Sequence, residues 1–182
     1  MRYPECRSAR RIAAAGREST MLDTGSVTVR RARQEDLDAI VALWVELVEY
    51  HHNLDCRLWE AAEDGTLTYR EWALESMGEP RAAVLVAEVD GEVVGFAHAL
   101  PGRAPASMRE RAMGVIADVC VAPGHRNRGV GRRLAEAAIS HFVEQGMTEV
   151  MLSAAVGNEG AVRFWRSLGF DPILYSMHRP LA

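Results

Sequence analysis

Lysine is absent from this chain of 182 residues, in which arginine supplies all 21 basic side chains. A protein of this sequence therefore has no lysine side chain of its own to modify. Cysteine is also scarce. The chain has three, Cys6, Cys56 and Cys120, an odd number of residues that lie far apart in the sequence. They predict a reduced, cytoplasmic protein without a disulfide framework or a metal site.

Long apolar runs are missing too, since none approaches the roughly 20 residues that cross a bilayer as a helix. The formal net charge of −4 argues against nucleic acid or an anionic membrane as the main partner. The positive charge is concentrated in residues 1–20, so the rest of the chain is the more acidic part. An acidic body suits a cationic substrate such as an amine.

Residues 1–25 show neither helical nor strand periodicity, and the length of the remainder fits one domain with a sizeable core. We expect a flexible N-terminal extension over 1–25 and a single domain over 26–182. An arginine-rich targeting peptide is the alternative for the extension, and Glu5 and Glu18 weaken it.

The hydrophobic periodicity of the domain predicts a mixed order of strands and helices. Strands are expected near 27–32, 82–89, 92–100, 111–121, 149–155 and 173–177, and helices near 34–50, 68–77, 129–145 and 158–168. Asp90-Gly91 predicts a two-residue hairpin turn. Gly95 indicates a bulge or a close backbone approach.

The most informative stretch is a strand that ends at Val121, followed by Arg126-x-x-Gly129-x-Gly131 and then a helix. A glycine-bearing loop at a helix N-terminus presents backbone N–H groups and the positive end of the helix dipole, which together bind phosphate. Arginines in and after the loop add charge. A plain strand-to-helix turn with exposed arginines is the alternative. The loop lacks the signatures of a nucleotide triphosphatase and of a dinucleotide-binding turn.

A second motif follows in the chain, Asn158-x-x-Ala161-x-x-Phe164-Trp165-x-x-x-Gly169-Phe170. By itself it is typical of an N-capped helix with a glycine stop. Together, in this order and spacing, the two motifs resemble those of the GNAT N-acyltransferases. The resemblance implies an α/β fold in which about four helices flank a twisted mixed sheet of six to seven strands. It spans roughly residues 27–178.

The resemblance also implies acetyl-CoA as co-substrate, no metal, and a homodimer as an open option. Backbone groups of Cys120 and Val121 would hold the pantetheine arm and the acyl carbonyl. Asn158 and Trp165 would contact the same arm. The pyrophosphate would be held by backbone amides of the loop and the start of its helix, namely Arg126, Asn127, Arg128, Gly129, Val130, Gly131 and Arg132.

The implied reaction is acetyl transfer from the thioester to the primary amine of a small molecule or peptide. Asp118 interrupts an apolar strand near the expected thioester position and is our candidate base, with His98 second. A partly exposed strand aspartate is an equally good interpretation of Asp118. The Val121 N–H is the candidate donor to the tetrahedral oxyanion. His51 or His52 could contact the acceptor, and loop 101–110 could lie over it.

Trp165 stands where the family often has a tyrosine acid, and its indole cannot protonate a thiolate. Tyr175 on the expected last strand is a candidate substitute, although a thiolate with a pKa near ~8.5 leaves adequately without an acid. Cys120 is expected to be a packed residue rather than a nucleophile. A non-catalytic acyl-CoA sensor is the alternative function, and Trp165 favours it.

Overall fold

The computed structural model describes residues 26–57, 59–103 and 111–179. It divides into two compact units, Met1–Leu152 and Ser153–Ala182, and each is described by itself. The expected extension over 1–25, Cys6 and most of the loop 101–110 lie outside the described residues.

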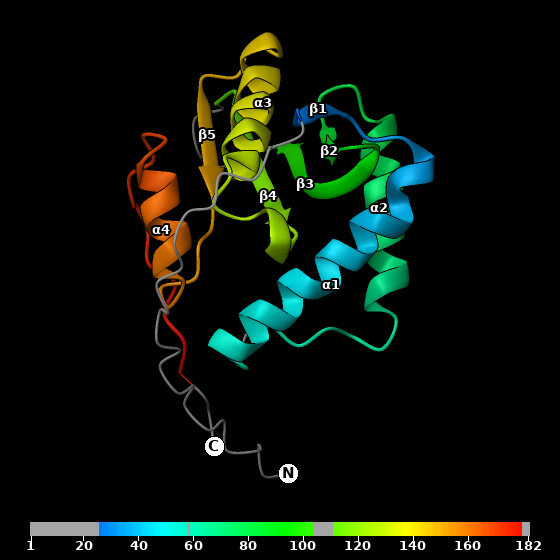
Figure 1. Ribbon diagram of the computed structural model, residues 1–182. Helices are drawn as coiled ribbons and strands as arrows, with labels where there is room; N and C mark the ends of the chain where they lie inside the picture. The colour runs from blue at the N-terminus through cyan, green and yellow to red at the C-terminus, as the bar shows by residue number, and fades with distance from the viewer. Residues whose placement is uncertain (1–25, 58, 104–110, 180–182) are drawn as a thin grey trace. The chain divides into compact units, whose positions relative to one another are not determined.

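The first unit contains a five-stranded sheet in the order β1-β2-β3-β4-β5 (Figure 1). The strands are β1 (Thr28–Arg31), β2 (Ala83–Val89), β3 (Glu92–Pro101), β4 (Met113–Val121) and β5 (Glu149–Leu152). Around them lie η1 (Gln34–Asp36), α1 (Leu37–Leu54), α2 (Gly65–Gly78), η2 (Pro123–His125) and α3 (Val130–Glu144). Strands β1 to β4 pair antiparallel and β5 pairs parallel to β4. The predicted mixed α/β class is confirmed.

The second unit contains α4 (Glu159–Arg166), and its Asn158 side chain accepts a hydrogen bond from the Ala161 N–H at 3.0 Å. The predicted cap is therefore confirmed. The predicted strand at 173–177 is wrong, and so is a sheet of six to seven strands, because the described residues form five. Ile173 and Tyr175 are 80% and 76% exposed. Their apolar pattern suits a strand, but no partner strand pairs with this segment in the described part of the chain.

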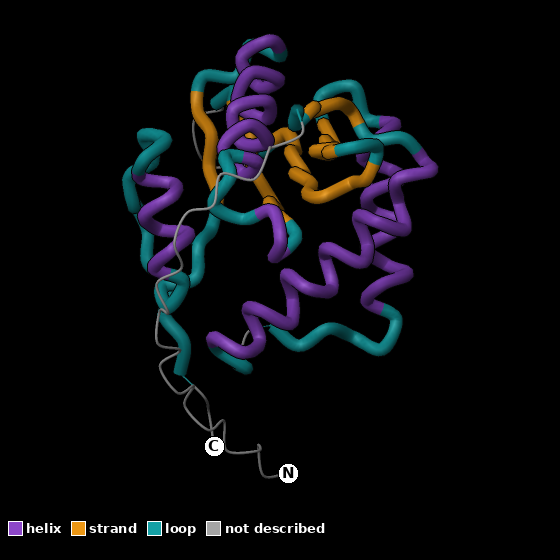
Figure 2. Tube along the Cα trace, viewed as in Figure 1, coloured by secondary structure: helices purple, strands orange, loops and turns teal. Residues whose placement is uncertain are grey.

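Helices cover both faces of the five-stranded sheet, whose strands are orange and whose helices are purple in Figure 2. On one face, α1 and α2 pack Ile40 and Tyr69 against Val86, Phe96 and Cys120 of the strands. On the other face lies α3, whose fully buried residues include Leu134 and Phe142. No helix in the described ranges is long and apolar enough to cross a membrane.

The hairpin forms as predicted, with Asp90 and Gly91 at positive φ values of 52° and 84°. Two bulges interrupt the regular pairing. One lies on β3 between its pairs Glu88–Val93 and Ala87–Gly95. The other lies on β4, where His98 pairs with Asp118 but Ala99 pairs with Ile116, so that Ala117 is the extra residue. The second bulge shifts the register in the middle of β4, next to Ile116, the last residue of β4 that pairs with β5.

Two glycines permit close packing of α3 on the sheet. A Cβ at Gly95 would lie 2.8 Å from the Cys120 carbonyl oxygen of β4 and 3.2 Å from Leu134 Cδ1 of α3. A Cβ at Gly114 would lie 2.6 Å from the Phe142 ring. The sequence indicated the first of these approaches and gave no sign of the second.

We predict that Gly114→Ala lowers the free energy of unfolding by about 1–3 kcal/mol, because the new methyl group must displace a buried ring. Urea denaturation would measure the change. Gly78→Ala is the matched control, since nothing lies within 4 Å of a Cβ there. Equal stability of the two variants would contradict the packing described for α3.

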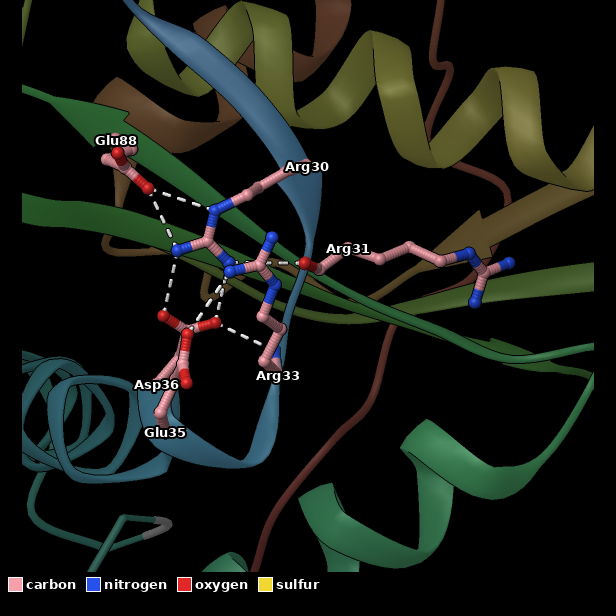
Figure 3. Close-up of polar contacts among 6 residues, drawn as sticks. All are labelled: Arg30, Arg31, Arg33, Glu35, Asp36 and Glu88. Atoms are coloured by element: carbon pink, nitrogen blue, oxygen red, sulfur yellow. Dashed lines mark hydrogen bonds and ion pairs between the residues drawn. The ribbon is translucent and has the colours of Figure 1, made fainter. Parts of the chain in front are cut away.

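Beside the first strand, Arg30 joins two carboxylates in one network (Figure 3). Its guanidinium donates to Asp36 at 2.7 and 3.0 Å and to Glu88 at 2.9 Å. Asp36 also accepts the Arg33 backbone N–H at 2.7 Å. These hydrogen bonds, the one from Arg30 above all, lower the pKa of Asp36 against the opposing effect of its burial. The network fixes the entry of the chain into α1.

Arg31, the next residue, points away from this network (Figure 3) and reaches α3. Its guanidinium donates to His141 Nδ1 at 3.2 Å. Because arginine has no acceptor, Nδ1 must be the bare nitrogen, and Nε2–H donates to the Arg81 carbonyl at 3.1 Å. His141 thus links β1, the segment just before β2 and α3 through its two ring nitrogens.

We predict that Asp36→Asn destabilises the protein by about 1–3 kcal/mol at neutral pH, because it removes a charged acceptor from buried donors. A carboxylate with a lowered pKa stabilises the fold above its unfolded pKa and loses this contribution as the pH falls through its folded value. The difference between wild type and variant should therefore shrink in acid. Denaturation at several pH values would test this, with the exposed Glu35→Gln as control. A pH-independent difference would contradict the assignment.

Candidate functional site: the end of β4

The pairing between β4 and β5 covers only part of β4. It runs from Met113–Glu149 to Ile116–Leu152 and stops there, whereas β4 continues to Val121. The Ala122 N–H donates to the Val94 carbonyl at 2.9 Å, so the backbone groups of Ala122 face β3. Since successive residues of a strand alternate, those of Cys120 face β3 as well, and those of Val119 and Val121 face the opposite side. This side is the one that β5 has left.

The loop that follows β4 leads directly into α3. Gly129 caps the helix with φ +82°, a conformation that suits glycine, and nothing lies within 4 Å of where its Cβ would be. The first amides of a helix lack intrahelical acceptors, and the 15 residues of α3 place a full dipole behind them. The loop therefore has the open, donor-rich form that an anion site requires.

The arginines of this region do not all face the loop. Arg126 donates from Nε to the Val121 carbonyl at 2.8 Å and lies over the Tyr50 ring at 5.9 Å. Arg133 donates to the Val27 carbonyl at 2.9 Å. Arg128 is exposed. Arg126 thus links the end of β4 to α1, which the sequence pattern did not indicate.

Asp118 lies on the face of the sheet covered by α1 and α2, where it is half-buried. It accepts a hydrogen bond from the Tyr69 hydroxyl at 2.9 Å. Burial raises the pKa of the carboxyl group, while the bond from Tyr69 and the charge of His51 oppose this effect. Burial and the Asp118 charge raise the pKa of Tyr69, so it remains a donor. A carboxylate that is fixed by a hydrogen bond and partly desolvated, as Asp118 is, is suited to accept a proton from a cation.

His98 lies beside Asp118 as its direct cross-strand partner on β3. It is 0% exposed, and neither ring nitrogen has a hydrogen-bond partner among the described residues. Its ring packs against Trp72 with the centroids 4.2 Å apart. Burial lowers the pKa of His98 to about 4, so the imidazole is neutral at physiological pH.

Cys120 fits the expectation of a packed residue. It is buried in the core beside Phe96, and burial raises the pKa of its thiol to about 11 against the opposing charge of Arg126. A thiol with so high a pKa is a poor nucleophile at neutral pH. No group of three potential metal ligands is found in the described part of the chain.

Three of the predicted residues, Asn158, Trp165 and Tyr175, belong to the second unit. Trp165 packs edge-on against Phe164 and Phe170, and Asn158 caps α4. Tyr175 lies in a segment without regular structure rather than on a strand. The roles of these three residues toward acetyl-CoA stay predictions.

Tyr69 contacts a candidate site residue, and the sequence did not predict this contact. Its side chain is a core aromatic whose ring is stacked on that of Trp44, with the centroids 4.6 Å apart. The bond to Asp118 spans 49 residues of sequence. A tyrosine on the inner face of a helix opposite an isolated strand acid was the available signal.

Comparison with known proteins agrees with this architecture. The family model described as "Acetyltransferase (GNAT) family" matches residues 30–170. The chain belongs to the GNAT family. An uncharacterized N-acetyltransferase of Archaeoglobus fulgidus is 30% identical over 76% of this chain and 89% of its own length. One from Methanocaldococcus jannaschii is 27% identical over 79% of this chain, which spans 60% of that protein.

Among solved structures, the chain is similar to the aminoglycoside N-acetyltransferase AAC(6')-Iy, which was determined in complex with CoA. The TM-score is 0.66 at 18% identity, over 90% of this chain and 99% of that one. The likeness shows a GNAT fold.

We predict that Tyr69→Phe raises the pKa of Asp118 further, because it removes the hydrogen bond that favours the ionised form. Titration of the Asp118 carboxyl carbon by NMR would measure the shift. Tyr50→Phe serves as control, since the Tyr50 ring contacts Arg126 rather than Asp118. An unchanged or lower pKa in Tyr69→Phe would show that the hydroxyl does not hold the carboxylate.

Proposed function

We propose that this protein transfers the acetyl group of acetyl-CoA to a primary amine of a small molecule, by direct attack of the amine on the thioester. The observation that carries the proposal is the position of Asp118. The Asp118 carboxylate, which accepts a hydrogen bond from Tyr69, lies three residues before Val121. Val121 ends β4, the strand whose pairing with β5 stops at Ile116, and the loop to α3 begins immediately after it. An acid–base group and an anion site thus flank one open strand edge.

Each part of this arrangement has a task in the reaction. The outward backbone groups of Val119 and the Val121 N–H offer hydrogen bonds to an extended ligand such as the pantetheine arm, which would bind as an added strand does. The Val121 carbonyl already accepts a hydrogen bond from Arg126. The Val121 N–H is the candidate donor to the oxyanion. The loop from Arg126 to Arg132 holds the pyrophosphate through its amides and the start of α3.

The reaction consists of two proton losses from the amine nitrogen and one exchange of a C–S bond for a C–N bond. Asp118 takes one proton from the bound ammonium, directly or through water, and the neutral amine nitrogen attacks the acyl carbon. The C–N bond forms, the C–S bond breaks, and the CoA sulfur leaves as a thiolate. The nitrogen then loses a second proton, so that one proton ends on the thiol and one is released to the solvent. Nothing in the sequence requires a covalent enzyme intermediate.

We predict that Asp118→Asn lowers kcat/KM for the amine by about 10²–10⁴-fold, because the carboxylate that accepts the proton of the amine is removed. The affinity for acetyl-CoA should stay unchanged, because the loop to α3 is untouched. Thiol release from acetyl-CoA would measure the rate and calorimetry the affinity. The wild-type rate should fall as the pH drops through the raised pKa of Asp118, since only the ionised form accepts a proton. Full activity in Asp118→Asn would rule it out as the base.

The phosphate role of the loop is tested by two nearly isosteric changes at Gly129. Aspartate and asparagine both tolerate a positive φ and both suit a helix cap. We predict that Gly129→Asp weakens acetyl-CoA binding by about tenfold more than Gly129→Asn, because a carboxylate repels the pyrophosphate. Calorimetry would compare the two. Wild-type affinity in both variants would contradict a phosphate site at this loop.

An acyl-CoA sensor without catalysis is the second candidate, and Trp165 in place of the usual tyrosine favours it. A sensor would bind acetyl-CoA, and no amine would release thiol from it. The two candidates are therefore separated by the thiol assay alone, once binding is established.

A further inference from the structure

Within the described part of the chain, the two ring nitrogens of His98 have no hydrogen-bond partner, and this absence points to a ligand. Buried polar atoms are nearly always hydrogen-bonded, and one that is not needs an explanation. Both ring nitrogens of His98 lack a partner among the described residues, although its side chain is 0% exposed. A neutral imidazole carries one N–H and one bare nitrogen, so it offers one acceptor.

Asp118 supplies a second acceptor on the same face. Residues directly opposite on antiparallel strands have Cβ atoms about 4.5–5.5 Å apart, and His98 pairs directly with Asp118. Tyr69 ties the two together, since its hydroxyl donates to Asp118 and its ring lies 6.1 Å from that of His98. An ammonium group has three N–H donors, which can serve the carboxylate and the imidazole at once.

The surroundings of these acceptors are aromatic. Trp72 packs on His98 and remains 37% exposed, while Trp44 stacks on Tyr69. The other charges that reach this region are those of Glu46, an exposed residue of α1, and of His51 and Arg126. Arg126 would repel a second ammonium group on the ligand. One well-held carboxylate among rings suits a single ammonium with an aromatic body rather than a polycation.

We propose that the acceptor is an arylalkyl primary monoamine, whose ammonium group binds between Asp118 and His98 while its aromatic ring lies against Trp72. The proposal rests on the proposed function and names its substrate class. It also gives His98 a role other than base: its neutral ring accepts a hydrogen bond from the ammonium without repelling it. Trp72 selects the body of the substrate.

The test uses the full chain, acetyl-CoA and three acceptors: 2-phenylethylamine, spermidine and kanamycin. We expect kcat/KM for 2-phenylethylamine to exceed the other two by about tenfold or more. Trp72→Leu should remove most of this preference. Leu74→Ala, an exposed change on the same helix, should not alter it.

His98→Phe removes the acceptor and should raise KM for 2-phenylethylamine about tenfold without changing KM for acetyl-CoA. His98→Gln retains an amide oxygen and should recover part of the loss. A second measurement does not depend on the folding of a variant: in wild-type protein, the ¹⁵N signal of the bare His98 nitrogen should move when 2-phenylethylamine is added.

The outcomes distinguish a failure of the proposed acceptor class from a failure of the proposed acetyltransferase function. Thiol release with spermidine or kanamycin but not with 2-phenylethylamine would overturn this inference and leave the proposed function intact. A shift of the His98 signal without thiol release would support the amine site and contradict the enzyme. Neither a shift nor thiol release with any amine would overturn both.

Discussion

The departure of β5 from β4 is the constraint on which the candidate site depends. The two strands pair as far as Ile116 and Leu152, and β4 then continues without β5. Backbone N–H and C=O groups strongly require hydrogen-bond partners. Here the side chain of Arg126 binds the Val121 carbonyl, and the neighbouring outward groups are available to an extended ligand. The bulge at Ala117 lies at the point of departure and shifts the register so that Asp118 lies opposite His98.

This short strand end separates two chemically different surfaces. On the side of α3, the loop and the helix N-terminus provide amide donors and Gly129 leaves open space. On the side of α1 and α2, burial makes the surroundings of Asp118 apolar, raises its pKa and keeps His98 neutral. Tyr69 joins the second surface to α2. An anion and an amine can thus be received from opposite faces of one sheet and meet at its edge.

Much of this could be predicted from local pattern. Asp90-Gly91 fixed the hairpin, and the order of strand, glycine loop and helix indicated the anion site, because turn and cap chemistry is local. The prediction of a last strand was wrong because it used only the composition of residues 173–177. Whether such a segment forms a strand depends on pairing with a strand that is distant in the sequence. Three contacts are long-range, and no spacing rule in a single sequence reveals them: Tyr69 with Asp118, Gly114 with Phe142, and Arg126 with Tyr50.

Hydrogen exchange with and without acetyl-CoA would test the central claim most directly, namely that an acyl-CoA occupies the edge of β4 that β5 leaves. When acetyl-CoA is added, exchange should slow at the outward amides of Val119 and Val121 and in the loop from Arg126 to Arg132. Exchange in β2, which is paired on both sides, should stay unchanged. Unchanged exchange at Val119 and Val121, under conditions where calorimetry shows acetyl-CoA bound, would contradict it.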